Sequence, residues 1–407
     1  MATKLTIDQQ MEIIKRGTVS IVPEDELRAK LEKSQKTDVP LKIKLGLDPT
    51  APDIHLGIAV VLRKMRQFQD LGHEVIIIIG DFTASIGDPS GVSVTRPLLT
   101  PKEIAVNATT YKEQYCKILD ESKTRVVYNS EWLRELDFAG VVRIAAKMTV
   151  ARVLERDDFT ARLSDGRPIG LHELLYPMSQ AYDSVVLEAD IEVGATDQTF
   201  NILTGRDLQR EFGQEPQVAL FMPILVGLDG EKKMSKSLGN YVGVSEPPNM
   251  MFGKVMSIPD NLMPQYFELC TNLSMDEIRQ IVAGHPMDAK KRLAWQIVNI
   301  YHGPEAADQA RAEFERVFSA REIPTDMPVI EVPKDALKDG KVWIVRLLVT
   351  AGFAGSNSEA RRLVEQGAVT MDGEKITDVN AEISVEEGQV LHVGKLKFGR
   401  IQRANDL

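Results

Sequence analysis

Two lysines and two serines lie close together in residues 233–237, which read Lys-Met-Ser-Lys-Ser and have glycines nearby at positions 227, 230 and 239. Ammonium groups and hydroxyls bind phosphate oxygens, and neighbouring glycines allow a loop to close around a ligand. The segment is therefore a candidate polyphosphate clamp. A short lysine–serine string is also common in solvated turns, so the interpretation depends on what else the sequence brings to the same place.

His55 and Gly57 form a second candidate phosphate site, far upstream of the lysines. Alternating apolar residues predict a strand over residues 41–47, and apolar residues at helical spacing predict a helix near residues 57–71. His55 then lies at the start of a helix, where backbone amides favour anions, and Gly57 lets a phosphate or a planar ligand approach the backbone. A lone histidine more often has an ordinary structural role, but its pairing with the lysine loop favours nucleotide binding.

The two segments together resemble the signature pair of class I aminoacyl-tRNA synthetases, with His-Leu-Gly-Ile at residues 55–58 and Lys-Met-Ser-Lys-Ser at residues 233–237. Further segments are similar to bacterial tyrosyl-tRNA synthetases, and the similarity spans nearly the whole chain: residues 80–84, 87–91, 176–183 and 194–198. The resemblance implies an enzyme that activates L-tyrosine with ATP and Mg²⁺ and transfers the tyrosyl group to tRNA(Tyr) in translation. It also implies a homodimer.

The alternation of predicted strands and helices favours an α/β fold with a parallel sheet and right-handed crossovers. The resemblance implies a Rossmann-type catalytic domain, a helical anticodon-binding domain and a small C-terminal α+β RNA-binding domain, with the dimer interface on a helical insertion. Prolines at positions 324, 328 and 333, followed by Gly340, indicate a linker. We therefore expect a catalytic domain over residues 1–245 with its insertion around 100–170, an anticodon-binding domain over 246–322, a linker over 323–340 and an RNA-binding domain over 341–407.

Ligands of parallel α/β sheets bind beyond the carboxyl ends of the strands, and Asp48, His55 and Thr83 all follow such predicted ends. The resemblance implies an ATP site made of Gly46, Asp48, His55, Gly57, Gly194, Asp197, Leu225, Lys233 and Lys236. It assigns catalysis to His55, Gly57, Arg96, Lys233, Ser235 and Lys236. Neither chemical step needs a protein nucleophile, so we expect catalysis by positioning and by stabilisation of charge on the leaving phosphates.

The amino-acid pocket is indicated by Tyr176, Gln180 and Asp183, whose spacing places three polar groups on one face of a helix. The resemblance implies that Tyr176 and Gln180 hold the substrate ammonium group with Asp88, and that Asp183 accepts the phenol hydrogen bond. It adds Gln198 for the carboxylate. A capping or surface role is the alternative for Asp183. The expected tyrosine-binding set is Lys44, Thr83, Asp88, Tyr176, Gln180, Asp183 and Gln198.

The sequence departs from the family pattern at three positions. Ile58 stands where a second histidine is usual, and Val92 stands where a basic residue usually follows Gly91. Lys44 stands where one branch of the family places a second phenol-binding tyrosine, and strand parity with Gly46 directs its side chain toward the pocket. The departures leave open how this chain handles ATP and what occupies the far end of the pocket.

Residues 343–373 resemble an RNA-binding module that is shared with a small-subunit ribosomal protein and with pseudouridine synthases. Ser358 is a plausible N-cap for a helix that carries Arg361 and Arg362, and Gly367 should end that helix. The resemblance implies that both arginines bind tRNA; a solvated helix face is the alternative. The basic run at Lys290, Lys291 and Arg292 fits anticodon binding and a scaffold of solvated helices equally well.

Composition excludes several classes of protein. The 407 residues are 43% hydrophobic and 27% charged, which is typical of a globular protein with more than one domain. No continuous apolar run is longer than that of residues 75–79, which is too short to cross a bilayer, and the N-terminal residues lack a signal core, so we expect a cytoplasmic protein without membrane contact. Cys116 and Cys270 are isolated, so neither a disulfide framework nor a metal-ligand cluster is predicted.

Net charge sets where RNA could bind. The chain carries a net charge of −10, but residues 341–407 contain nine basic and nine acidic residues, so the preceding residues carry the whole excess. RNA contact must therefore use local basic patches. Two rival hypotheses stay open: a duplicated, synthetase-like tRNA-binding protein with reduced or altered aminoacylation, and another nucleotide-dependent ligase, which would explain only the first 240 residues.

Overall fold

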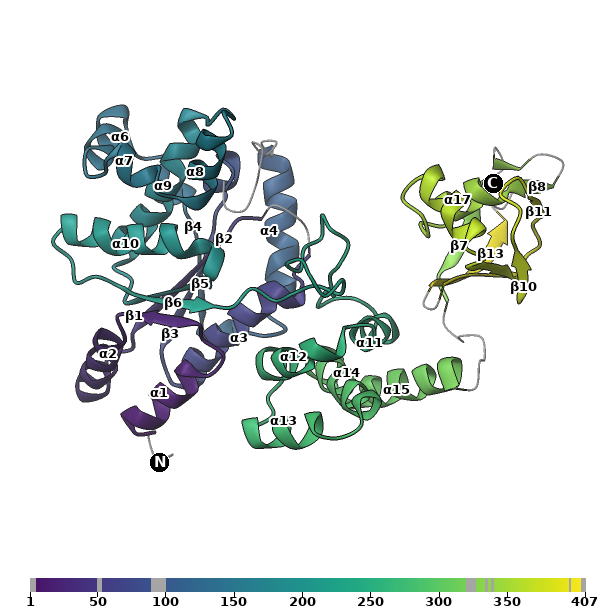
Figure 1. Ribbon diagram of the computed structural model, residues 1–407. Helices are drawn as coiled ribbons and strands as arrows, with labels where there is room; N and C mark the ends of the chain where they lie inside the picture. Colours follow the sequence, from purple (N-terminus) through teal and green to yellow (C-terminus); the bar gives the residue numbers. More distant parts are fainter. Residues whose placement is uncertain are drawn as a thin grey trace. The chain divides into compact units, whose positions relative to one another are not determined.

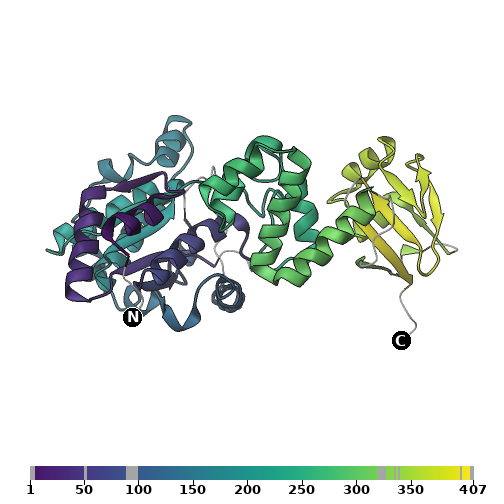
Figure 2. The ribbon, with the colours of Figure 1, turned by 90° about the horizontal axis from the view of Figure 1, so that it is seen from below.

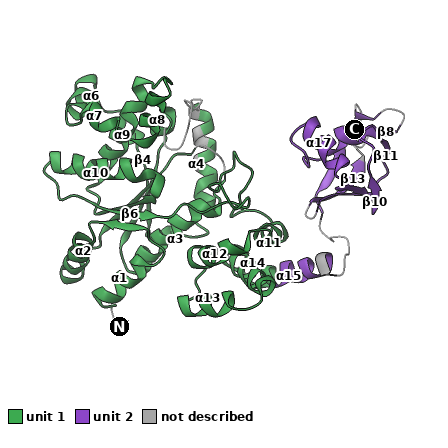
Figure 3. Ribbon diagram, in the orientation of Figure 1, with its two compact units in different colours: residues 1–307 green, residues 308–407 purple. Residues whose placement is uncertain are grey.

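The computed structural model describes residues 5–49, 53–88, 100–319, 327–333, 336–337, 340–394 and 397–403. The chain divides into two compact units, residues 1–307 and 308–407, which are coloured separately in Figure 3. The boundary that we expected at residue 245 does not separate compact units, because the helices that follow it belong with the sheet of the first unit. The functional names of the parts stay predictions.

The described strands of the first unit form one six-stranded sheet in the order β1-β6-β5-β2-β3-β4. Strands β2 to β6 run parallel, whereas β1 pairs antiparallel with β6. Their bounds are β1 Ser20–Val22, β2 Lys42–Leu47, β3 Glu74–Ile79, β4 Thr124–Tyr128, β5 Ile191–Ala195 and β6 Val218–Met222. The chain builds outward from β2 on both sides, so β2 and β5 flank the point where the strand order reverses, and ligands bind at such a point.

Helices cover both faces of this sheet. Helix α3 (Leu56–Asp70) packs on one face, and α9 (Leu171–Leu187) and α10 (Thr199–Glu211) cover the other (Figure 1; Figure 2 gives the view from below). Side chains alternate along β2 and β5, and Lys44 and Glu192 point to the face that carries α9 and α10. The strand and helix predicted over 41–47 and 57–71 are confirmed to within one residue at each end.

The helical insertion predicted around residues 100–170 needs a correction. Strand β4 lies inside this range and pairs with β3, so the segment also supplies one edge of the sheet. Its alternation was short and was hidden among helical patterns. The helices of this segment are α4 Pro101–Tyr115, α5 Ser130–Leu133, α6 Phe138–Ala145, α7 Val150–Val153 and α8 Asp157–Ser164.

The region that follows the sheet is helical, as the pattern predicted. Its helices are α11 Pro248–Met256, α12 Met263–Cys270, α13 Met275–Val282, α14 Pro286–His302 and α15 Pro304–Ser319. The N-terminal helices are α1 Ile7–Lys15 and α2 Glu24–Thr37, and the 3₁₀ turns are η1 Thr83–Ser85, η2 Glu121–Lys123, η3 Thr196–Gln198 and η4 Asp260–Leu262. Among the described helices, none has the length and apolar character that crossing a bilayer requires.

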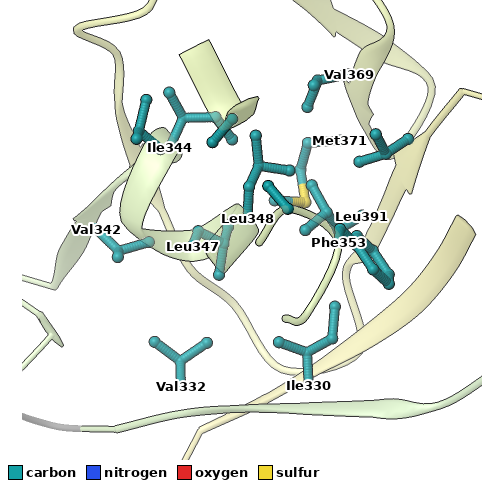
Figure 4. Packing of buried hydrophobic residues seen from close by; sticks show 14 of the residues in the cluster. Ile330, Val332, Val342, Ile344, Leu347, Leu348, Phe353, Val369, Met371 and Leu391 are labelled. Carbon is teal, nitrogen blue, oxygen red and sulfur yellow. The ribbon is translucent and has the colours of Figure 1, made fainter. Parts of the chain in front are cut away.

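The second unit contains a five-stranded sheet in the order β10-β9-β12-β13-β7 and a separate β8–β11 pair. Its elements are β7 Val329–Val332, β8 Lys341–Trp343, α16 Ile344–Thr350, α17 Asn357–Glu365, β9 Val369–Met371, β10 Glu374–Ile376, β11 Glu382–Ser384, β12 Val390–Val393 and β13 Lys397–Arg403. Leu347 and Leu348 of α16 pack against strand residues that include Ile330 and Val332 (Figure 4).

Two predictions for this unit were wrong. Residues 323–340 are not only a linker, because β7 pairs in parallel with β13 and buries Ile330 and Val332 in the core. Helix α17 is capped by Ser356, whose hydroxyl accepts from the Glu359 amide at 3.2 Å, and not by Ser358. The helix does end before Gly367, which has a positive φ of 64°.

Candidate active site

A cavity of about 720 Å³ lies beyond the carboxyl ends of β2 and β5. Its volume falls within the range of small-molecule sites. The lining contains the following predicted site residues: Gly46, Asp48, His55, Gly57, Thr83, Asp88, Tyr176, Gln180, Asp183, Gly194, Asp197, Gln198, Leu225, Lys233, Ser235 and Lys236. Arg96 and Val92 lie outside the described residues, and Lys44 lies behind the lining.

His55 occupies the N-cap position of α3, where an extended backbone leads into the helix. The adjoining backbone is held by the Leu56 amide, which donates to the Val242 carbonyl at 2.9 Å. Burial, with Lys236 and then Lys233 nearby, lowers the pKa of His55 to about 4, so the ring is neutral at neutral pH. A neutral imidazole has one N–H to donate to a phosphate oxygen without adding a full charge.

Gly57 leaves little room between its backbone and the His55 ring. A Cβ at residue 57 would lie 3.0 Å from both Cε1 and Nδ1 of His55, closer than side chains normally pack. We therefore expect Gly57→Ala to slow ATP turnover by ~10-fold, because small displacements of a catalytic group are costly. The test compares kcat and KM for ATP, with the free energy of unfolding as the control. An unchanged kcat in a folded variant would contradict this role of Gly57.

The lysine loop is fastened at its base by Asn240. The Asn240 Oδ1 accepts from the Ser235 amide at 2.8 Å, and its Nδ2 donates to the Lys233 carbonyl at 3.1 Å and to Asp229 Oδ2 at 2.7 Å. The Met234 amide donates to the Leu225 carbonyl at 2.8 Å. These bonds fix the loop backbone and leave both lysine side chains directed at the cavity.

Each lysine of the loop pairs with an aspartate. Lys233 Nζ lies 3.4 Å from Asp197 Oδ2, and Lys236 Nζ lies 3.3 Å from Asp53 Oδ2. Burial lowers the pKa of Lys236, and the Asp53 carboxylate partly offsets this effect. Both pairs are partly exposed, so they hold the side chains weakly and a polyphosphate can replace the carboxylates.

Tyr176, Gln180 and Asp183 lie on one face of α9, as their spacing predicted, and all three line the cavity. The Tyr176 hydroxyl donates to Asp48 Oδ2 at 2.9 Å, and the Thr83 hydroxyl donates to Asp48 Oδ1 at 2.7 Å. Burial, followed by the Asp48 carboxylate, raises the pKa of Tyr176, so its hydroxyl stays protonated. The aspartate beyond β2 is thus held by two hydroxyl donors.

Asp183 lies at the buried end of this pocket. Its Oδ1 accepts from Trp132 Nε1 at 2.8 Å, and its Oδ2 accepts from Asn129 Nδ2 at 3.5 Å. Burial raises the pKa of Asp183 to about 7, although Lys44, Trp132 and Asn129 each act to lower it. A carboxylate has about four acceptor positions, so it retains the capacity to accept from a ligand hydroxyl.

Gln198 and Asp88 are joined in a polar network at the other side of the pocket. Gln198 Nε2 donates to Asp88 Oδ2 at 2.9 Å, and its Oε1 accepts from Asn201 Nδ2 at 3.0 Å. Buried Arg156 donates to Asn201 Oδ1 at 2.6 Å, and its guanidinium lies 3.8 Å from Asp88. A network of acidic and amide groups at this position can hold an ammonium group and a carboxylate together.

Two family models match the chain. The model described as "tRNA synthetases class I (W and Y)" matches residues 35–319, and "Tyrosine--tRNA ligase SYY-like C-terminal domain" matches residues 322–392. The "Tyrosine--tRNA ligase" of Moorella thermoacetica is 58% identical over 401 residues, covering 97% of this chain and 96% of that protein. The one from Carboxydothermus hydrogenoformans is 54% identical over 402 residues, covering 97% and 98%.

The chain belongs to the tyrosine–tRNA ligase family of class I aminoacyl-tRNA synthetases. The resemblance described from the sequence is therefore confirmed. The crystal structure of the Archaeoglobus fulgidus tyrosyl-tRNA synthetase complexed with L-tyrosine superposes with a TM-score of 0.62 at 25% identity, covering 75% of this chain and 100% of that chain. The predicted α/β fold class is confirmed as that of tyrosyl-tRNA synthetases.

Several residues of this tyrosine–tRNA ligase site were missed from the sequence. Trp132 and Asn129 follow β4, and Arg156 lies between α7 and α8, so no shared periodicity connected them to α9. Glu192 had a signal, because it is a charged residue within the buried strand β5. Its Oε1 accepts from Gln180 Nε2 at 3.0 Å, and this hydrogen bond restricts rotation of the Gln180 side chain.

Two of the residues that depart from the family pattern, Ile58 and Lys44, are described in this tyrosine–tRNA ligase, and only Ile58 lines the cavity. Ile58 lines the cavity beside His55 and cannot hydrogen-bond to ATP. Parity predicted that Lys44 points toward the pocket; its side chain lies on the α9 face but outside the cavity lining, is 0% exposed, and pairs through its ammonium group with Glu192. The role of Lys44 as a direct tyrosine contact stays a prediction.

Arg361 and Arg362 lie exposed on α17 in the second unit. The Arg361 guanidinium lies over the Trp343 ring, 5.1 Å from its centroid, whereas Arg362 has no such ring partner among the described residues. Arg361 therefore has a packing role within this unit that Arg362 lacks. Substitutions that test RNA binding should begin with Arg362.

Proposed function

We propose that this enzyme activates L-tyrosine with ATP to tyrosyl-adenylate and transfers the tyrosyl group to tRNA(Tyr) during translation in the cytoplasm. The proposal is supported by one arrangement: a cavity with a buried carboxylate, Asp183, at one side and His55 with two lysines at the other. A phenol needs a buried acceptor, and a triphosphate needs cationic and neutral donors. The cavity offers both to one bound pair of substrates.

The first step joins the two substrates without a covalent enzyme intermediate. The tyrosine carboxylate attacks the α-phosphorus of ATP, the new C–O–P linkage forms, and pyrophosphate leaves with the electron pair of the broken P–O bond. Gln198, Asp88 and Tyr176 would orient the amino acid, while Lys233 and Lys236 stabilise negative charge on the leaving phosphates. Neutral His55 would donate its N–H to a phosphate oxygen as charge builds up.

Mg²⁺ would be bound by the ATP phosphates themselves. Among the described residues, no group of three or more His, Cys, Asp or Glu side chains is arranged to hold a metal ion. The two aspartates that face the lysine loop, Asp53 and Asp197, are already paired with lysines. We therefore assign no step to a metal held by the protein.

In the second step, the terminal ribose hydroxyl of tRNA(Tyr) attacks the tyrosyl carbonyl and AMP leaves. The net charge of −10 opposes RNA binding by the whole surface, so binding would depend on local cationic sites such as Arg361 and Arg362. The helical region over 246–322 would contact the anticodon. Its basic run is partly neutralised, since Lys290 Nζ lies 2.6 Å from Asp260 Oδ1.

The proposed function is tested by tyrosine-dependent exchange of labelled pyrophosphate into ATP. We expect exchange that requires tyrosine and does not require tRNA. Ile58 favours one alternative, a tRNA-binding relative with reduced aminoacylation, because an aliphatic side chain lines the cavity where a polar one is usual. Tight binding of tRNA(Tyr) without any exchange would support that alternative and reject ours.

Homodimerisation is part of the proposal and is supported by exposed apolar side chains on the helical segment. Phe138 is 84% exposed and Val142 and Val150 are also exposed in this segment, and Leu171 at the start of the adjoining helix α9 is 81% exposed. Large exposed apolar groups on neighbouring helices are typical of an interface between subunits. These side chains would be buried against the same surface of a second copy.

We expect Phe138→Glu to raise the dimer dissociation constant by at least ~30-fold, the effect of removing an anchor worth ~2 kcal/mol. Sedimentation equilibrium of the full chain measures it. Met287→Glu is the matched control, since Met287 is an exposed apolar residue on α14, away from the helical segment. Equal dissociation constants in both variants would contradict the assignment of this interface.

A further inference from the structure

A buried ion pair lies behind the amino-acid pocket. Lys44 on β2 and Glu192 on β5 are direct cross-strand partners, and Lys44 Nζ lies 3.0 Å from Glu192 Oε1. Their side chains are 0% and 2% exposed. Burying two charges costs desolvation energy that a matched apolar pair would avoid, so such a pair is weak evidence for stability alone. Its contacts indicate another purpose.

The pair is hydrogen-bonded to α9, the helix that carries the proposed tyrosine-binding residues Tyr176, Gln180 and Asp183. Lys44 Nζ donates to the Gln180 carbonyl at 3.4 Å, and Gln180 Nε2 donates to Glu192 Oε1 at 3.0 Å. One turn further along α9, the Ser184 hydroxyl donates to Glu192 Oε2 at 3.3 Å. Gln217 of the segment before β6 also donates to Glu192. The bonds of Gln180 and Ser184 fix α9 relative to the sheet, and the bond from Gln217 holds the Glu192 carboxylate in place.

The same two charges act on Asp183. The ammonium group of Lys44 lowers the pKa of Asp183, and the carboxylate of Glu192 raises it, while burial has the largest effect and raises it to about 7. The other groups that face Asp183 are Trp132 and Asn129 beyond β4, both donors, and Tyr176 on its own helix. Lys44 is therefore the cation that offsets two buried carboxylates.

We propose that Lys44 and Glu192 form a positioning pair for tyrosine recognition, in which Glu192 orients the Gln180 amide and Lys44 favours the ionised, phenol-accepting form of Asp183. This inference rests on the proposed function. It replaces direct contact between Lys44 and the substrate by an action through Gln180 and Asp183. A structural cross-link between β2 and β5 is the alternative, and the two differ in how the variants respond to pH.

The test measures KM and kcat for tyrosine in pyrophosphate exchange on both sides of neutral pH, in four full-length proteins: unmodified, Lys44→Met, Glu192→Gln and the double variant. Protonation of Asp183 weakens the acceptor for the phenol, so KM for tyrosine should rise as pH falls through the pKa of Asp183. Lys44→Met removes the cation and should move this rise to higher pH. Glu192→Gln removes the anion and should move it to lower pH.

In the double variant, the pH at which KM for tyrosine rises should return toward that of the unmodified enzyme, because this variant removes one charge of each sign. We call this pH the midpoint. At neutral pH, Lys44→Met should raise KM for tyrosine by ~5-fold, because a rise of about one unit in a pKa near 7 lowers the ionised fraction of Asp183 from about one half to about one eleventh. KM for ATP should not change in any variant. Shifts in opposite directions would support the pair, whereas parallel pH profiles, or shifts in the same direction, would overturn it.

Two outcomes are kept distinct. Absence of tyrosine-dependent exchange in the unmodified chain rejects the proposed function itself, whereas normal exchange with parallel profiles rejects only the positioning pair. Glu192→Gln changes little volume and keeps an acceptor for Gln180. It therefore decides the question by itself if Lys44→Met does not fold: a midpoint that fails to move to lower pH overturns the proposal.

Discussion

Replacing Asp183 by alanine should lower the preference for tyrosine over phenylalanine by at least ~100-fold, because an unpaired buried charge costs ~1–3 kcal/mol or more and each 1.4 kcal/mol is tenfold. With phenylalanine bound, the Asp183 carboxylate keeps Trp132 and Asn129 as donors but loses its ligand donor. The alanine variant removes that penalty. It also removes the acceptor that tyrosine uses. The kcat/KM should therefore rise for phenylalanine and fall for tyrosine.

The measurement is kcat/KM in pyrophosphate exchange with each amino acid. Asp288→Ala is the control, since Asp288 is an exposed aspartate in the first turn of α14. Discrimination that survives in Asp183→Ala would assign phenol recognition to another group. Glu192 would then be the first candidate, because it lines the cavity whereas Lys44 does not.

The part of this site that sequence reasoning found depends on local periodicity. Tyr176, Gln180 and Asp183 share a face because helical spacing alone brings them together. Asp48 and His55 were placed because they follow a strand end and begin a helix, and both features are visible within a dozen or so residues. Positions of this kind need no knowledge of the sheet order.

The remainder of the site depends on which segments the fold makes neighbours. Trp132 reaches Asp183 only because β4 lies at the sheet edge beside β3, which was hidden within an expected insertion. Lys44 and Glu192 face each other because β2 and β5 are adjacent across the reversal of strand order. A charged residue within a mostly apolar strand indicates a buried partner of opposite charge. The sequence did not show that Lys44 and Glu192 are partners, because it does not give the strand order.

The C-terminal boundary shows how local composition can mislead. Prolines around residues 324–333 gave the segment the character of a linker, although residues 329–332 alternate Val-Ile-Glu-Val. In the fold, Ile330 and Val332 belong to the core beneath Leu347 and Leu348 (Figure 4). An edge strand tolerates neighbouring prolines because only one side of it pairs.

A chain that ends at Ser319, the last residue of α15, should form tyrosyl-adenylate like the full-length enzyme but charge tRNA(Tyr) ~100-fold less efficiently or worse, as expected from losing two charge-assisted contacts of ~1.5–3 kcal/mol each. All residues proposed to act on tyrosine and ATP precede it, and the truncated chain keeps most of the negative excess. Pyrophosphate exchange and tRNA charging at physiological salt separate the two steps.

Two further proteins sharpen this experiment. A chain that ends at Ala336 should be less soluble than the one that ends at Ser319, because it keeps β7 without β13 and exposes Ile330 and Val332.

In the full-length protein, Arg362→Glu should lower tRNA charging by ~10-fold and make charging less sensitive to salt, since a phosphate contact is lost. Full charging by the Ser319 chain would refute an RNA-binding role for the second unit, and an unchanged salt dependence in Arg362→Glu would exclude that arginine from the contact.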